Sequence, residues 1–331
     1  MEISNEITGW LKNLNTDKSN PWPDEVTNQA PHKPFLLLSI IDGIKEGWID
    51  SNEIFLSQEL VDNFFVYWKG IMGQARTTRI ALPFFYMKSE PFWALIYKPD
   101  KNEYANAPSL TGLKNRLQFA RMNPELYLLI ENDKTRSMVQ NLIANHYFNS
   151  KTAEKVKKLS SLNYDAHKYS EELRKFTNKK FISHYSEEGK IVESTVNQQV
   201  RKQGFRKVIR ENYNYTCSVC RTKVVTPVES CHVVGAHIIP WNESYNDDPR
   251  NGISLCPNHH WLFDEMMMTI RDDFSVKLSP WLKKNNNTWH EYDLISDTKI
   301  LLPANSQLYP AKEALMYHND KFENYHRDID R

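Results

Sequence analysis

Seven of the Cys, His and Asn side chains within 217–260 are candidates to bind metal ions or move protons, namely Cys217, Cys220, His237, Asn251, Cys256, His259 and His260. Cys217 and Cys220 form a CxxC pair, and Cys256 and His259 form a CxxH pair after 35 intervening residues. Each pair offers two ligands from one tight turn, and two pairs complete the tetrahedron that Zn²⁺ prefers. The spacing therefore predicts a structural zinc site. The alternative is that the cysteines are small buried residues without a metal.

Two neighbouring histidines follow the last cysteine, and we expect them to serve different purposes. Successive residues on a helix diverge by about 100°, so His260 points elsewhere if His259 binds the zinc. His237 lies in the strand-like run VVGAHIIP, and Asn251 follows a polar turn. A single histidine in an apolar strand is more often a packed core residue. The order of strand histidine, loop asparagine and helical histidine makes a functional role the stronger interpretation.

This order occurs in the motifs CSVC, AHIIPW and NDDPRNGISLCPNHHWLFD. The segment of roughly 201–275 that contains them resembles the zinc-bearing HNH, or ββα-metal, endonucleases. The resemblance implies that His237 is a general base, that His260 holds a catalytic Mg²⁺ or Mn²⁺, and that Asn251 orients the base-bearing strand or its imidazole. Phosphodiester hydrolysis needs a base for water and a cation for the developing charge. An imidazole suits the first role at cellular pH.

The residue before the base departs from a common pattern of this family. Many HNH nucleases carry an Asp or His there as a further metal ligand, whereas this chain has Ala236. Asp264 lies four residues after His260 and shares its helical face, which makes it a candidate metal ligand, although a structural carboxylate is the stronger interpretation. Asp247 and Asp248 are interpreted as turn residues before Pro249.

The first 150 residues are expected to select the target. Three segments resemble the sulfur-binding domain of type IV restriction endonucleases that recognise phosphorothioated DNA, namely APHKPFLLLSIIDGIKEGWI, LVDNFFVYW and ALPFFYMKSEPFWAL. An apolar pocket favours sulfur because sulfur is larger and more weakly hydrated than oxygen. By resemblance, the pocket would contain Leu82, Pro83 and Tyr86, with His32 and Lys33 near the phosphate. Arg76 and Arg79 are added as DNA-binding candidates from their charge and position.

Three alternatives remain open at this point. The aromatic residues of LPFFYM are ordinary core residues in most proteins. An HNH endonuclease could instead use its front domain to read methylated or hydroxymethylated bases, which would require flipping the base into an aromatic cage. The chain could also be a non-catalytic, zinc-containing DNA-binding protein. The joint presence of His237, Asn251 and His260 argues against this last alternative.

The surrounding elements are predicted from apolar spacing and capping residues. We expect a helix over 34–44, then a turn, a short strand and a second helix over 59–72. The aromatic residues and the three prolines of 79–100 favour short strands or extended turns. Further helices are expected around 109–121, after a capping serine, and around 124–147.

Length and charge indicate a multi-domain α+β protein. With 331 residues, we expect a mainly helical DNA-reading domain with short strands (1–150), a basic helical linker (151–200) and a zinc-bearing HNH domain (201–331). Residues 151–211 contain 15 Lys and Arg against 8 Asp and Glu, a balance suited to double-stranded DNA. The alternative is that this basic segment is a solvated helical connector.

Composition also indicates where the protein acts. The sequence lacks a secretory signal or a run long enough to span a membrane, and four cysteines suit a reducing compartment better than disulfides, so we expect a cytoplasmic protein. A homodimer is plausible because one HNH site cuts one strand.

Overall fold

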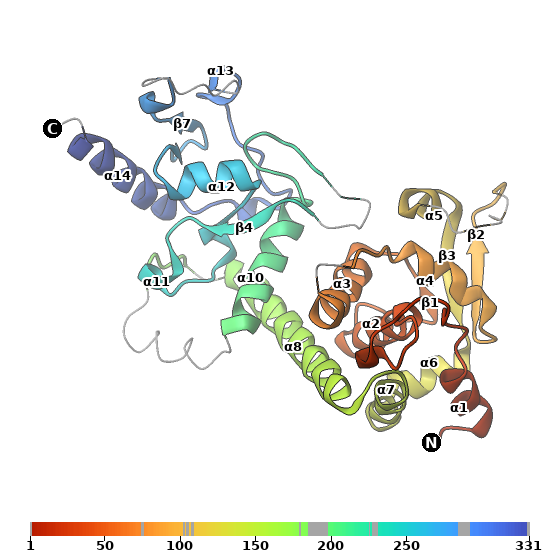
Figure 1. Ribbon diagram of the computed structural model, residues 1–331. Helices are drawn as coiled ribbons and strands as arrows, with labels where there is room; N and C mark the ends of the chain where they lie inside the picture. The colour runs from red at the N-terminus through yellow and green to blue at the C-terminus, as the bar shows by residue number, and fades with distance from the viewer. Residues whose placement is uncertain are drawn as a thin grey trace. The chain divides into compact units, whose positions relative to one another are not determined.

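The computed structural model describes residues 2–73, 76–101, 103, 106, 109–178, 180–184, 198–224, 226, 231–283 and 292–329. Residues 179 and 185–197 of the expected basic linker lie outside this set. The chain divides into two compact units, of which unit 1 is mainly Met1–Asp165 and unit 2 mainly Ala166–Thr226 and Cys231–Arg331. Both combine helices with short strands, which confirms the α+β class (Figure 1). Within the described residues, no helix is long and apolar enough to cross a membrane.

Unit 1 surrounds a helix that is buried along most of its length. Its elements are α1 (Asn5–Lys12), η1 (Asp24–Val26), α2 (His32–Glu46), β1 (Glu53–Ile54), α3 (Gln58–Met72), α4 (Ala81–Tyr86), η2 (Met87–Ser89), β2 (Trp93–Tyr97), α5 (Leu110–Arg116), β3 (Leu117–Met122), α6 (Pro124–Glu131), α7 (Asp133–Tyr147) and the first part of α8 (Ser150–Arg174). The predicted helices over 34–44 and 59–72 are α2 and α3. Because α2 packs against α3, α4, α6 and α7, its apolar residues form the centre of the core.

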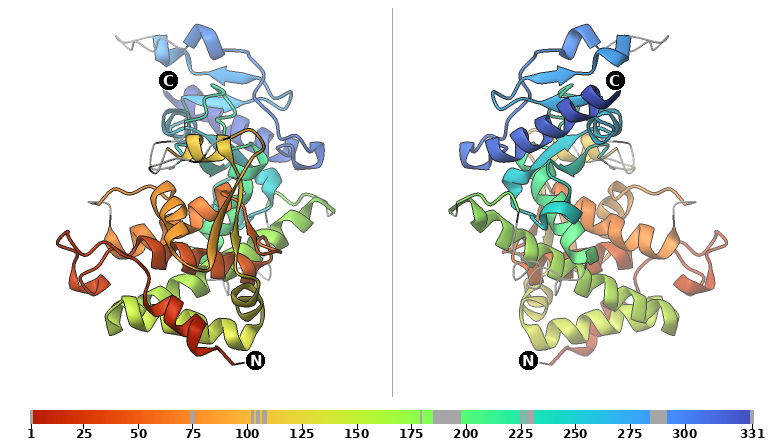
Figure 2. Two further views of the ribbon diagram at one scale, coloured as in Figure 1. Left: turned by 90° about the vertical axis from the view of Figure 1, so that its right-hand side faces the viewer. Right: turned by 90° about the vertical axis from the view of Figure 1, so that its left-hand side faces the viewer.

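Local signals explain where several of these helices begin and end. The Ser57 hydroxyl caps α3 by accepting from the Leu60 N–H at 3.2 Å, and the Ser109 hydroxyl caps α5 by accepting from the Gly112 N–H at 3.1 Å. Gly47 ends α2 with a φ of 81°, a conformation that favours glycine. A three-stranded antiparallel sheet in the order β1-β3-β2 completes the unit, and Figure 2 shows β2 and β3 side by side.

Three sequence-based expectations for unit 1 need correction. Residues 81–86 form a helix instead of an extended segment, because Pro83 lies in the first turn, where its missing N–H costs no helical hydrogen bond. The helix expected over 109–121 ends at Arg116, and 117–122 pairs as a strand between β1 and β2. The segment predicted as helical over 124–147 is divided at Asn132, which caps α7.

Unit 2 contains two antiparallel hairpins and the helices that pack on them. Its elements are the rest of α8, η3 (Lys175–Asn178), α10 (Gln198–Asn212), β4 (Val234–His237), α11 (Trp241–Ser244), η4 (Pro249–Asn251), β5 (Gly252–Leu255), α12 (Pro257–Asp264), β6 (Met268–Ile270), β7 (Val276–Leu278), η5 (Pro280–Lys283), α13 (Tyr292–Ile295), η6 (Ser306–Leu308) and α14 (Lys312–Ile329). β4 pairs with β5, β6 pairs with β7, and α14 lies against β6 in both views of Figure 2.

Two glycines allow α10 to pack closely on the β4–β5 hairpin. A Cβ atom on Gly252 would collide with Ile209 and Phe205, and one on Gly235 would approach Ile209 Cβ to 2.9 Å. The absence of side chains at these two strand positions lets the helix approach the strands. His237 pairs with Gly252 in the register of the hairpin, so α10 faces the strand end that carries His237.

Candidate functional site

The four residues of the predicted zinc site lie together in unit 2. The ligand atoms of Cys217, Cys220, Cys256 and His259 all lie within 4.8 Å of one another. His259 Nδ1 is 3.0 Å from Cys256 Sγ and 3.6 Å from Cys217 Sγ. These separations suit a tetrahedral ion between thiolate and imidazole ligands. The Cys217 thiol donates to the Cys256 sulfur and lowers the pKa of Cys256, and His259 acts in the same direction.

Cys231 and the two adjacent histidines have distinct environments. Cys231 lies outside the four-residue group, and its sulfur contacts the Tyr215 carbonyl at 3.6 Å. His259 is buried in the cysteine group, whereas the His260 side chain is 37% exposed, with its Nε2 3.4 Å from Asp264 Oδ2. The neighbouring histidines of α12 therefore point to different surroundings. His260 and Asp264 are two candidate ligands for a catalytic metal.

His237 lies at the end of β4, and one of its ring nitrogens is within hydrogen-bond distance of a carboxylate. Its Nε2 is 2.7 Å from Asp247 Oδ1, and the Phe205 ring of α10 stacks on the imidazole with centroids 3.8 Å apart. The side chain is 19% exposed, so the imidazole is partly open to solvent. In the part of the chain that the structure describes, no hydrogen bond reaches Nδ1 of His237.

Asp247 is a candidate site residue that the sequence interpretation missed. It was expected to be a turn residue, but it is fully buried, accepts hydrogen bonds from Arg201 and Tyr169, and lies 2.7 Å from His237 Nε2. Arg201 Nη1 donates at 2.8 Å and 2.9 Å to its two oxygens, and the Tyr169 hydroxyl donates at 2.9 Å. Arg201 belongs to the basic segment 151–211, whose charge was expected to suit DNA. It is 3% exposed and points into the protein.

Asn251 supports the base-bearing strand through the backbone. Its side-chain oxygen accepts from the Ile239 N–H at 2.9 Å, and its amide donates to the carbonyls of Ile239 and Asn246 at 3.1 Å and 3.0 Å. The Asn251 carbonyl also accepts from the Ile238 N–H at 2.9 Å. These bonds hold the segment that follows His237, and the imidazole itself is held by Asp247.

Comparison with known proteins identifies this part of unit 2. Residues 217–271 match the family model described as HNH endonuclease. The chain contains an HNH endonuclease domain. A search of curated proteins found no match. Among solved structures, a modification dependent TagI restriction endonuclease is similar at 20% identity with a TM-score of 0.29, over 41% of this chain and 44% of the TagI chain. The chain thus spans less than half of that protein's length.

The HNH match covers β4, β5 and α12, and α12 packs against both strands. It contains His237, Asn251 and His260, together with the four residues of the candidate zinc group. The match begins at Cys217, so it does not include Tyr169, Arg201 or Phe205. Helices α8 and α10, which precede the matched segment, thus supply three of the side chains around His237 and Asp247.

The HNH domain has a donor set that fits metal-dependent chemistry. Among the described residues, the four-residue cysteine and histidine group is the one cluster of three or more such ligands. The protein would therefore contribute few ligands to a catalytic ion, which suits Mg²⁺ because it retains several waters. Such an ion stabilises negative charge on phosphate and on the leaving oxygen. Asn251 holds the segment that follows the end of β4 through its backbone hydrogen bonds.

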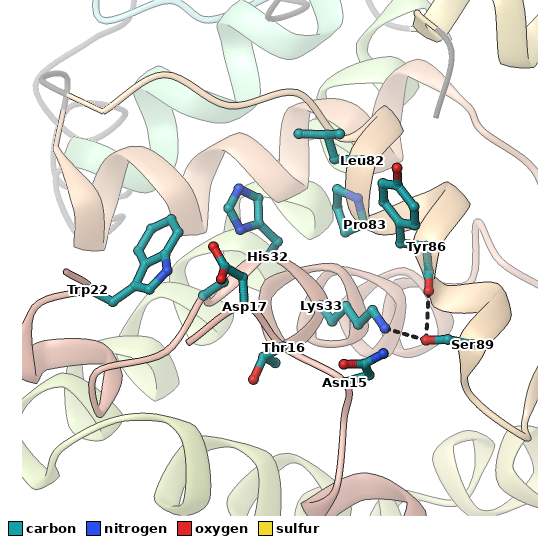
Figure 3. A pocket seen from close by; sticks show the side chains of 11 residues that line it. Asn15, Thr16, Asp17, Trp22, His32, Lys33, Leu82, Pro83, Tyr86 and Ser89 are labelled. Carbon is teal, nitrogen blue, oxygen red and sulfur yellow. Dashed lines mark hydrogen bonds between the residues drawn. The ribbon is translucent and has the colours of Figure 1, made fainter. Parts of the chain in front are cut away.

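A separate cavity in unit 1 brings together the other predicted site residues. It has a volume of about 420 Å³, and its lining comprises Asn15, Thr16, Asp17, Trp22, Ala30, His32, Lys33, Leu82, Pro83, Tyr86 and Ser89. Figure 3 shows Leu82, Pro83 and Tyr86, which α4 contributes, and His32 and Lys33 from the start of α2. Arg76 and Arg79 are not part of this lining.

The polar residues of the cavity provide little net positive charge. Lys33 is buried, with its ammonium group bound to the Glu90 carboxylate and at 2.8 Å from the Ser89 hydroxyl, as Figure 3 shows for Ser89. Burial lowers the pKa of His32 to about 4, so its imidazole is neutral at pH 7. Hydrogen bonds from Ser19, and then Asn20, lower the pKa of Asp17 to about 2, which keeps that carboxylate ionised.

Arg76 lies beside the cavity without lining it. Its guanidinium is 5.0 Å from the Trp22 ring, which is part of the lining, and donates to the Pro21 carbonyl at 3.0 Å. Arg76 is exposed and Arg79 is half-buried. Of the two arginines suggested by sequence, Arg76 is therefore the one with a described contact to a cavity residue.

Proposed function

We propose that this protein is a modification-dependent DNA endonuclease that recognises phosphorothioated double-stranded DNA in unit 1 and hydrolyses nearby phosphodiester bonds at the HNH domain. The observation that carries the recognition step is the composition of one cavity. Leu82, Pro83 and Tyr86, which the resemblance suggests for the sulfur pocket, all line it. His32 and Lys33, which the resemblance suggests for contact near the phosphate, line it as well. The nuclease step is supported by the HNH match at 217–271.

The low net charge of the cavity supports a site that distinguishes sulfur from oxygen through apolar contacts instead of through electrostatic attraction to the phosphate. Lys33 is paired with Glu90, His32 is neutral and Asp17 is ionised, so the cavity offers no uncompensated cation among these residues. A non-bridging sulfur loses less hydration than oxygen when it enters such a site. Exposed basic groups outside the cavity, such as Arg76, would supply the sequence-independent attraction to phosphates.

In the proposed cleavage step, Nδ1 of His237 accepts a proton from water. The resulting oxygen nucleophile forms a bond to phosphorus, the bond from phosphorus to the 3′ oxygen breaks, and solvent protonates that oxygen. His260 and Asp264 would hold Mg²⁺ or Mn²⁺, while Cys217, Cys220, Cys256 and His259 would hold structural Zn²⁺. We also propose that two copies act together for a double-strand cut, because each copy has one HNH site.

The test is cleavage of matched duplexes with and without one phosphorothioate, by the full chain, with Mg²⁺ or Mn²⁺. We expect cleavage of the modified duplex alone or strongly preferred. Tyr86→Ala should reduce the preference, because its exposed ring lines the cavity, and Tyr325→Ala, an exposed tyrosine on α14, serves as control. Equal cleavage of both duplexes by the unmodified protein would exclude phosphorothioate recognition.

A second function is favoured by the aromatic lining of the same cavity. Trp22, His32 and Tyr86 surround a space of about 420 Å³, and the Trp22 and His32 rings meet edge to face at 5.4 Å. A flipped methylated or hydroxymethylated base could stack in such a site. Duplexes with modified bases belong in the same cleavage assay. Preference for one of them over a phosphorothioated duplex would favour this alternative.

A further inference from the structure

The group that surrounds His237 extends beyond the HNH match. Asp247 accepts from Arg201 and Tyr169 while its Oδ1 lies 2.7 Å from His237 Nε2. Arg201 also lies with its guanidinium 3.9 Å from the Trp241 ring. Residues from α8, α10 and the loop before β5 thus hold one carboxylate against one imidazole.

We propose that Asp247 is a positioning residue that holds His237 in a single tautomer, with the proton on Nε2 and the lone pair on Nδ1. A carboxylate has only acceptor atoms, so a neutral imidazole that bonds to it must donate through Nε2–H. Nδ1 is then unprotonated and able to accept a proton from water. This role rests on the proposed function only through the assignment of His237 as the base.

Arg201 and Tyr169 keep the carboxylate in its orientation. Both Asp247 oxygens accept from Arg201 Nη1, at 2.8 Å and 2.9 Å, and Oδ2 also accepts from the Tyr169 hydroxyl at 2.9 Å. Arg201 has donors and no acceptor, so its side chain requires an oxygen opposite it. The Phe205 ring, stacked on the imidazole at an interplanar angle of 4°, restricts rotation of the ring out of this plane.

The same geometry predicts what an amide at position 247 would do. In Asp247→Asn, the single side-chain oxygen would turn toward Arg201 and Tyr169, which only donate to it. The amide nitrogen would then face His237 Nε2 and donate to it. His237 would carry its proton on Nδ1, the wrong nitrogen for accepting a proton from water. The substitution therefore exchanges the tautomer with no change in volume. It also leaves the buried Arg201 guanidinium without its carboxylate, so the melting temperature of the variant is measured beside its rate.

The experiment combines spectroscopy with cleavage by the full chain. Long-range ¹H–¹⁵N spectra of histidine-labelled protein, recorded without Mg²⁺ or Mn²⁺ above the ordinary histidine pKa, distinguish the protonated from the unprotonated ring nitrogen. The His237 signals are assigned by their absence in His237→Ala. We expect Nε2–H in the unmodified protein, Nδ1–H in Asp247→Asn, and a rate loss in Asp247→Asn on the order of 10² to 10⁴.

Asp248→Asn is the matched control. Asp248 is a neighbouring buried carboxylate that pairs with Arg250 and caps η4. We expect this variant to keep the tautomer of His237 and most of the cleavage rate, even if its melting temperature falls. Tyr169→Phe removes one hydrogen bond to Asp247, and we expect the Nε2–H tautomer to persist with a rate loss below about tenfold.

The outcomes separate this proposal from the proposed function. If His237→Ala is inactive but Asp247→Asn keeps both the Nε2–H tautomer and its rate, Asp247 has no positioning role and the base assignment stands. If Asp247→Asn and Asp248→Asn lose rate equally with unchanged tautomers, Asp247 acts only through folding. If His237→Ala still cleaves, the base assignment and the role of Asp247 both fail. A different modification preference would leave this test unaffected.

Discussion

At the scale of single residues, burial changes what a charged side chain can do in this protein. Lys33 was expected near the phosphate and Arg201 belongs to the basic segment 151–211, yet each is buried and paired with a carboxylate. Breaking a buried ion pair leaves one charge without compensation, which is costly. Their first effect is therefore on structure, and DNA affinity would depend on exposed basic residues.

The buried pair of Lys33 with Glu90 predicts the effect of Lys33→Ala. The variant leaves Glu90 buried without its cation, so we expect the free energy of unfolding of unit 1 to fall by about 3–5 kcal/mol. Lys134→Ala, at an exposed lysine of α7, should change it by less than about 0.5 kcal/mol. Denaturant unfolding followed by tryptophan fluorescence measures both. Unchanged stability of Lys33→Ala, with weaker DNA binding, would contradict the structural role and favour a phosphate contact.

At the scale of elements, the candidate zinc group joins the turn that follows α10 to the start of α12. Cys217 and Cys220 lie in the turn that follows α10, and Cys256 and His259 lie at the start of α12. An ion bound by both pairs would hold the start of α12 against the turn that follows α10. Binding free energy at a structural zinc site contributes directly to folding.

We therefore expect one tightly held zinc per chain, and its loss in Cys256→Ser. If the variant costs about 4 kcal/mol, the melting temperature of unit 2 should fall by roughly 10 °C. Cys231→Ser is the matched control, because Cys231 is half-buried and lies outside the group. Metal analysis and thermal melting give the two measurements. Purified protein that contains no zinc without exposure to chelator would refute the site.

At the scale of the whole molecule, each unit contains a histidine whose burial disfavours its charged form. Burial lowers the pKa of His32 in unit 1 to about 4, and it does the same for His318 in unit 2. His318 is stacked on Phe263 with centroids 3.6 Å apart, and its Nδ1 is 2.8 Å from the Thr269 hydroxyl. Both units should therefore be sensitive to acid.

The direction of these pKa shifts determines how the free energy of unfolding changes with pH. Between about pH 6.5 and pH 4 the unfolded chain binds a proton at each position and the folded chain does not, so stability falls as pH falls. We expect each histidine to cost about 2 kcal/mol between pH 7 and pH 5. Replacing His318 by Gln should reduce this pH dependence in unit 2. Denaturant unfolding at both pH values tests it, and an equal pH dependence of the unmodified protein and His318→Gln would contradict the assignment.

The sequence by itself determined the features that depend on neighbouring residues. The CxxC and CxxH pairs, the caps at Ser57 and Ser109, and the helices around 34–44 and 59–72 are set by spacing of a few residues. The order of His237, Asn251 and His260 indicated an HNH domain before any geometry was available, and the match at 217–271 agrees. Local sequence failed at 81–86, where an aromatic and proline-rich segment is helical because Pro83 lies in the first turn.

Only the tertiary structure decided which distant side chains act together. Arg201 and Asp247 are separated by 46 positions, and nothing in the local sequence of either shows that they form a buried pair. The pairing of Lys33 with Glu90 and the cavity between α2 and α4 likewise depend on how helices pack. The physical reason is that helix and turn formation use local backbone bonds, whereas the environment of a charge depends on every element that excludes water from it.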